Sequence, residues 1–171
     1  MKLSRIGIDL AKNVFQLHDV DRHGKALWKR RLKRDQWLKA MLDKAEPRCV
    51  IGMEACTGAH HWARELQSRG YTVRLIPPQF VKPYVKSNKN DANDAEAICE
   101  AMSRPNMRLV AVKSVAQQDI QATHRIRAEL KDQRNAKANQ IRGLVAEYGL
   151  VAPLTRPSSI TKAGRWPRHW D

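Results

Sequence analysis

The stretch RIGIDLAKNVFQLHDV, residues 5–20, sets the fold class that this sequence predicts. Apolar β-formers recur at near-alternate positions on both sides of the polar Ala-Lys-Asn at residues 11–13. This pattern predicts two strands joined by a tight turn. One acid, Asp9, lies inside the otherwise apolar first strand.

Three further strands are expected after this pair. Turn-forming residues at 18–24 precede a strand over 26–32, which completes a three-stranded meander. A short apolar run at 49–53, a helix and a strand at 71–76 then form a crossover with parallel pairing. We therefore expect an α/β fold with a mixed five-stranded sheet flanked by helices.

Capping residues predict where the helices begin. Asp35 is expected to cap one helix and Thr57 the next, which Gly70 would end in a left-handed conformation. Another helix is expected over residues 91–102.

A much longer helix is expected near the end of the sequence. The S-x-x-Q capping box at residues 114–117 begins it, and it would extend to about Tyr148. At 1.5 Å per residue it would be about 50 Å long and would protrude from the sheet domain. We expect a sheet domain at 1–112, this helix within 113–150 and a disordered tail at 151–171. The helix could be a solvated basic helix or a coiled-coil helix that mediates dimerisation.

The charge points to a polyanionic partner. Of 171 residues, 32 are Lys or Arg and 17 are Asp or Glu, so the formal net charge is +15. Nucleic acid and anionic membrane are the common partners of such a chain. No apolar run of about 18–20 residues and no signal peptide is found, which favours nucleic acid and a cytoplasmic location. The three cysteines show no C-x-x-C spacing, so no structural zinc site is predicted.

Four acids form the candidate catalytic and metal-binding set. Asp9 lies in an apolar strand and Glu54 ends a buried one, while Asp91 and Asp94 lie three residues apart at a helix start. Clustered carboxylates repel one another unless a cation lies among them, and hard oxygen ligands suit Mg²⁺ or Mn²⁺. The pattern therefore predicts a divalent-metal site for phosphoryl transfer.

Structural interpretations of these acids remain open. Asp91 could be a helix cap, Asp94 a first-turn acid that the helix dipole favours, and Glu54 the partner of a lysine. Asp9 is the hardest to explain this way, because an unpaired carboxylate in an apolar strand is unfavourable.

Basic residues near the acids and on the long helix are the candidate nucleic-acid contacts. Taken singly, the four lysines near the acids are better explained as solvated surface than as contacts, and only as a group do they favour phosphate binding. The set comprises Lys12, Lys82, Lys86, Lys89, Arg125, Arg127, Lys131 and Arg134.

Three spaced motifs carry a resemblance to a known family. GIDLAK at 7–12, MEACTG at 53–58 and KNDANDA at 89–95 are similar to those of the DEDD transposases of IS110-type bacterial insertion sequences. The resemblance covers about residues 3–150. It implies a ribonuclease-H-like domain of the RuvC type, with Asp9, Glu54, Asp91 and Asp94 as its four acids.

The same resemblance implies partners. Family members recombine DNA under the guidance of a structured RNA made by the element, and their long helix mediates dimerisation. They also continue into a second domain with a serine nucleophile. Ser158 and Ser159 match no part of that motif, so we expect a truncated product with the metal-binding acids but without strand transfer.

Two alternatives remain. A non-catalytic DNA- or RNA-binding module would keep the fold and the charge without the chemistry. An actin-like ATPase lobe would use GIDL at 7–10 as a phosphate loop, but Ala11-Lys12 stands where Gly-Thr is expected and the chain is short for two such lobes.

Overall fold

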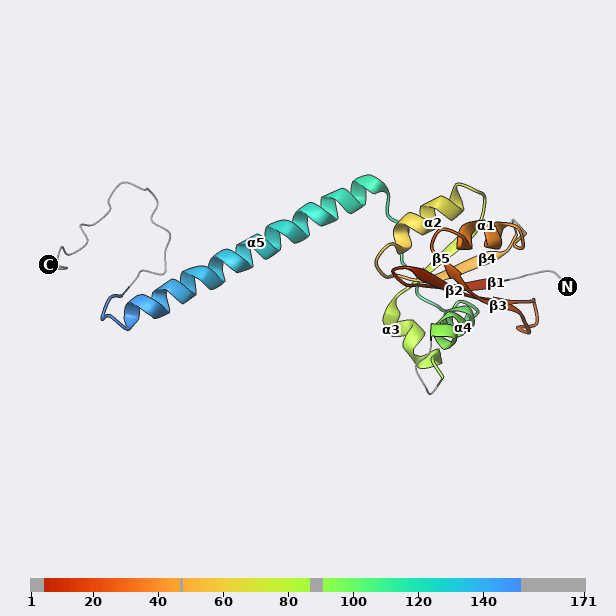
Figure 1. Ribbon diagram of the computed structural model, residues 1–171, viewed down its shortest axis with the longest axis horizontal. Coiled ribbons are helices and arrows are strands. Elements are labelled where there is room, and N and C mark those ends of the chain that lie inside the picture. Colours follow the sequence, from red (N-terminus) through yellow and green to blue (C-terminus); the bar gives the residue numbers. More distant parts are fainter. Residues whose placement is uncertain (1–4, 47, 87–90, 152–171) are drawn as a thin grey trace. The chain divides into compact units, whose positions relative to one another are not determined.

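The computed structural model describes residues 5–46, 48–86 and 91–151 (Figure 1). For Asp91 and Ala92 it describes the backbone alone. The chain divides into two compact units, with the boundary after Gln118. The first unit holds the sheet and its flanking helices, and the second holds most of one long helix. The tail predicted to be disordered lies outside the described residues, except for Val151.

Five strands form one mixed sheet in the order β3-β2-β1-β4-β5. The central strand β1 pairs antiparallel with β2 and parallel with β4. The outer strands extend both sides, β3 antiparallel to β2 and β5 parallel to β4. The bounds are β1 (Arg5–Leu10), β2 (Val14–Val20), β3 (Ala26–Lys33), β4 (Val50–Glu54) and β5 (Thr72–Ile76).

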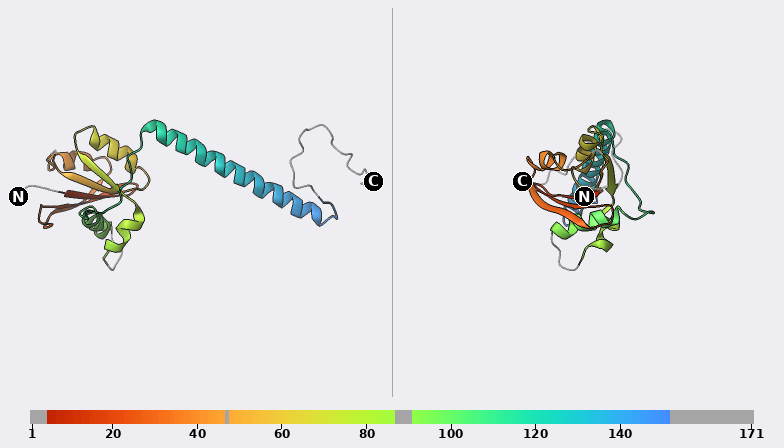
Figure 2. Two further views of the ribbon diagram at one scale, coloured as in Figure 1. Left: turned by 180° about the vertical axis from the view of Figure 1, so that it is seen from behind. Right: turned by 90° about the vertical axis from the view of Figure 1, so that its right-hand side faces the viewer.

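Helices cover both faces of this sheet (Figure 1 and the left view of Figure 2). One face carries α1 (Trp37–Leu42) and α2 (Ala59–Gln67). The other carries α3 (Pro78–Val81), the 3₁₀ helix η1 (Lys82–Tyr84) and α4 (Asp91–Ala101). A three-stranded meander followed by a parallel crossover confirms the predicted α/β, ribonuclease-H-like fold.

An aromatic cluster anchors the first face. Phe15, Trp37 and Trp62 contact one another with ring centroids 4.9–5.6 Å apart, in tilted and edge-on geometry. Complete burial of a large apolar side chain contributes about 1.5–3 kcal/mol, and such ring pairs add about 0.5–1.5 kcal/mol. This cluster therefore fixes α1 and α2 on the sheet.

Two glycines let α4 lie directly on the opposite face. A Cβ at Gly7 would lie 2.2 Å from the Ala95 carbonyl oxygen, and one at Gly52 would lie 2.5 Å from the Met102 sulfur. A side chain at Gly7 would force the helix backbone to move, and one at Gly52 would displace the Met102 side chain. The absence of a side chain at both positions brings the helix against the backbone of β1 and β4.

The predicted long helix is α5 (Val115–Ala146), whose 32 residues span about 48 Å at 1.5 Å per residue. It begins with the predicted capping box, in which the Gln117 amide donates to Ser114 Oγ and the Ser114 amide donates to Gln117 Oε1. Among the described residues, no helix combines the length and the apolar character needed to cross a bilayer.

Candidate metal and nucleic-acid site

Strand register brings two of the predicted acids together. β1 and β4 are paired in parallel from Arg5↔Val50 to Ile8↔Met53. The next residues on the two strands are Asp9 and Glu54. Because paired residues of neighbouring strands point to the same face, both carboxylates leave the same side of the sheet.

The two glycines identify that side. Side chains alternate along a strand, so Asp9 shares a face with Gly7, and Glu54 shares a face with Gly52. Both glycines lie under α4. Asp9 and Glu54 therefore project toward α4, at the carboxyl ends of two parallel strands.

Asp94, on α4, completes a group of three described acids. Burial and then the Asp94 carboxylate raise the pKa of Glu54, while Lys82 acts in the opposite direction. Burial, then Glu54 and Asp9, raise the pKa of the nearby Cys56 thiol. These effects link Asp9, Glu54 and Asp94 in one electrostatic neighbourhood.

The fourth acid is placed only by its backbone. Asp91 begins α4, three residues before Asp94. In the described side chains, no three His, Cys, Asp or Glu residues are close enough to hold a metal ion. The donor chemistry nonetheless fits a hard divalent cation, since the acids on this face supply only oxygen ligands.

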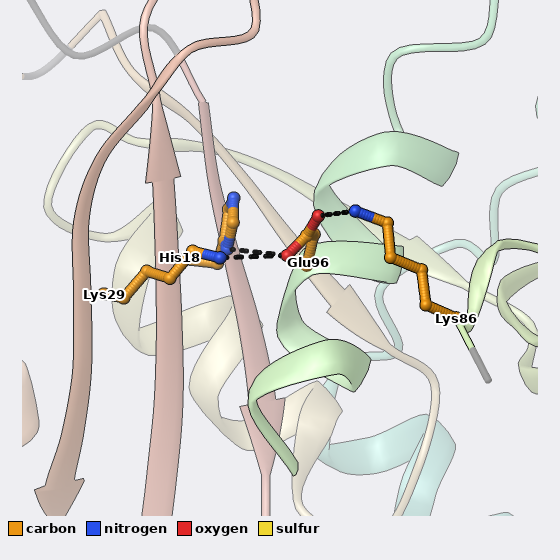
Figure 3. A network of polar contacts seen from close by, with 4 residues as sticks. All are labelled: His18, Lys29, Lys86 and Glu96. Carbon is orange, nitrogen blue, oxygen red and sulfur yellow. Dashed lines mark hydrogen bonds and ion pairs between the residues drawn. The ribbon is translucent and has the colours of Figure 1, made fainter. Parts of the chain in front are cut away.

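Glu96, a residue that sequence reasoning missed, holds the first half of α4 on the sheet (Figure 3). Its carboxylate accepts hydrogen bonds from Lys86 Nζ at 2.5 Å and Lys29 Nζ at 2.9 Å, and it lies 3.9 Å from His18 Nδ1. The two lysine hydrogen bonds lower the pKa of Glu96 to about 2. The pattern DANDAE gave no signal for this role, because the lysines come from distant segments.

The predicted basic residues near the acids lie in different surroundings. Lys12 is exposed in the turn after β1. Lys82 is near enough to Glu54 to lower its pKa. Lys86 is an ion-pair partner of Glu96, and Lys89 lies outside the described residues.

The four basic residues predicted on the long helix are all exposed on α5. Three of them follow the i, i+4, i+7 spacing of one helix face, whereas Arg125 lies off that face. The three are Arg127, Lys131 and Arg134.

Asp19 is a second acid that the sequence did not single out. It is completely buried on β2, and neither carboxylate oxygen has a hydrogen-bond partner. Burial raises its pKa to about 7. It pairs with Ile6 and therefore lies on the face opposite Asp9.

The fold and the acids at one strand edge agree with the transposase class that the three motifs indicated. A family model described as a transposase, that of the IS110-type DEDD transposases, matches residues 6–150. The chain belongs to this family.

Curated relatives agree with this assignment. The chain is 58% identical over 152 residues to a Pseudomonas aeruginosa protein named "Probable family 20 transposase", with 89% of this chain and 44% of that protein covered. It is 52% identical over 146 residues to the Coxiella burnetii transposase for insertion sequence element IS1111A, covering 85% and 40%. It is 47% identical over 148 residues to the Yersinia enterocolitica transposase for element IS1328, covering 86% and 44%. The chain thus spans less than half the length of these relatives.

Proposed function

We propose that this chain supplies the metal-binding and DNA-binding part of an IS110-type transposase. Asp9, Glu54, Asp91 and Asp94 would hold a divalent cation, Mg²⁺ or Mn²⁺. Such a cation supplies Lewis acidity to phosphoryl transfer on a DNA strand. Lys12 and Lys82 would contact the phosphates of that strand.

One observation carries this proposal. The register of β1 and β4 and the two glycines under α4 put Asp9 and Glu54 at one strand edge, facing the helix that carries Asp94. Glu54 lies in a setting where burial and a neighbouring carboxylate raise its pKa. A cation would remove the repulsion between these carboxylates and stabilise their charged forms.

The proposed partners are DNA, a structured guide RNA and a second copy of the chain. The formal charge of +15 supports polyanion binding, which also accounts for the exposed basic residues of α5. A stripe of exposed apolar residues on α5 supports pairing with a second helix. Because bacterial DNA is the proposed substrate, we propose a cytoplasmic location.

Metal titration tests the proposal. We expect the purified chain to bind Mn²⁺, and Asp9→Asn and Glu54→Gln to weaken that binding by about tenfold or more. Asp43→Asn is the matched control, because it removes one exposed carboxylate at the end of α1. Equal Mn²⁺ affinity in all four proteins would refute the metal site.

A non-catalytic nucleic-acid-binding module is the second candidate. It is favoured by the formal charge of +15 and by the exposed basic residues of α5, which bind a polyanion without any metal. On this alternative the chain would bind a labelled DNA duplex equally well in EDTA and in Mn²⁺, and Asp9→Asn would change neither affinity.

A further inference from the structure

A row of polar side chains crosses four strands on the face of the sheet that carries α4. Asp9 is paired with Gln16 of β2, and Gln16 is paired with Arg31 of β3. Glu54 flanks Asp9 on the other side, on β4. Since directly paired residues point to one face, Glu54, Asp9, Gln16 and Arg31 form a single polar row across the sheet.

Helix α4 buries the neighbouring positions but leaves this row accessible. The neighbouring row of paired residues on the same face consists of Gly7, His18 and Gly52, and all three are buried. In the polar row, Glu54, Asp9 and Gln16 are partly exposed and Arg31 is exposed. The row is therefore open to a ligand from the acids to the edge strand β3.

A hollow of about 140 Å³ adjoins the Arg31 end of the polar row. Gln16, His18, Lys29 and Arg31 line it from this face, with Leu17 and Arg30 between them along the strands. Lys29 is already ion-paired there with Glu96, which it shares with Lys86. Within the described part of the chain, the Arg31 side chain has neither an ion pair nor a hydrogen bond, and the side-chain amide of Gln16 has no hydrogen bond.

Arg31 thus places an uncompensated guanidinium beside a polar hollow and in line with the acids. A guanidinium binds phosphate oxygens in a two-pronged geometry. Strands lie about 4.8 Å apart, so the Cα atoms of Asp9 and Arg31 are separated by about 10 Å.

We propose that Arg31, assisted by Gln16, binds a backbone phosphate of the DNA strand whose reacting phosphate lies at the acids. The strand then runs across β2 toward the edge of the sheet at β3. This inference rests on the proposed function for the location of the reacting phosphate. Arg31 acts as a positioning residue, because it contacts the substrate away from the reacting atoms.

A pair of neighbouring arginines gives a matched test. Arg30 and Arg31 are both exposed on β3, but Arg30 is paired with Leu17 and its side chain leaves the opposite face. Binding of a fluorescein-labelled DNA duplex to the full chain is measured over a series of salt concentrations. Arg31→Gln should reduce the slope of log affinity against log salt by about 1 and weaken binding roughly eightfold at about 0.1 M salt. Arg30→Gln should have a clearly smaller effect.

Further measurements separate this inference from its alternatives. Arg31→Lys should restore the salt slope, because it returns the charge to the same place. Equal effects of the Arg30 and Arg31 substitutions, failure of Arg31→Lys to restore the slope, or a loss confined to a labelled RNA hairpin would each overturn the inference. Loss of Mn²⁺ binding in Asp9→Asn reports on the metal site alone, so failure of the proposed function is seen independently of the arginine comparison.

Discussion

Some of the acidic residues near α4 and the sheet could be predicted from the sequence pattern, and others could not. Asp9 and Glu54 could be singled out because an acid inside an apolar strand or at its end is unusual, and the register of β1 and β4 makes them neighbours. Glu96 was not predictable, because its partners Lys29 and Lys86 come from separate segments. Asp19 was missed because residues 18–24 were predicted to form a turn, whereas β2 extends to Val20 and includes Asp19.

Asp19 should make stability depend on pH. Its pKa rises from 3.8 to about 7 on folding, so between these values the folded chain holds a proton that the unfolded chain has lost. The free energy of unfolding should therefore fall as pH rises from about 4 to 7, by up to about 4 kcal/mol. Urea denaturation across this range measures the effect.

The substitution Asp19→Asn should remove most of that pH dependence, since the amide does not titrate. Asp43→Asn, at an exposed position, should leave it unchanged. A pH profile that is the same in wild type and in Asp19→Asn would contradict this assignment of the titrating group.

Glu96 should have the opposite pH dependence. Its pKa falls from 4.5 to about 2 in the folded chain, so its stabilisation is present above about pH 4.5 and is lost as pH falls toward 2. Glu96→Gln should cost at most about 1 kcal/mol at pH 7, because the partner lysines are exposed and solvent screens the pairs. The cost should shrink in denaturation experiments near pH 2.5, and a cost independent of pH would argue against an ionic origin.

At the scale of elements, local signals predicted the strands and helices better than the caps. The Ser114 capping box formed as predicted, because both of its bonds are local. The predicted caps at Asp35 and Thr57 were wrong: α1 begins after Gln36, and α2 begins after Gly58 in a left-handed conformation. Tertiary packing of Trp37 and Ala59, both completely buried, shifts each helix start along the chain.

Replacement of glycine by alanine should have opposite effects at two positions, one under α4 and one in α5. Gly7→Ala would put a Cβ against the Ala95 carbonyl oxygen, so it should destabilise the sheet unit by about 3 kcal/mol. In α5, Gly143 has open space around its Cβ position, and Gly143→Ala should stabilise the helix by about 0.5–1 kcal/mol. Thermal melting followed by circular dichroism measures both. A neutral Gly7→Ala would show that α4 does not lie this close.

At the scale of the whole molecule, the sequence motifs predict the family and the strand pattern predicts the sheet, but neither predicts how many copies of the chain associate. One face of α5 carries exposed apolar residues at helical spacing, whose burial would need a partner: Ile126, Leu130, Ile141 and Leu144. Coiled-coil pairing of two copies through this face remains a prediction.

Sedimentation of variants tests that prediction. We expect a dimer for the wild type and a shift toward monomer for Leu144→Lys, because a buried charge at the helix interface is unfavourable. Ala128→Lys places the same charge on the opposite face of α5 and should leave the dimer intact. A monomeric wild type, or equal dissociation by both substitutions, would rule out pairing through this face.

The convergence of the acids on one cation is the central claim. Anomalous diffraction from a Mn²⁺-soaked crystal of the chain tests it most directly. We predict a peak between Asp9 and Glu54, within about 2.0–2.3 Å of carboxylate oxygens from both residues and from α4. A well-ordered site without any peak there, or with Mn²⁺ bound only elsewhere, would contradict the claim.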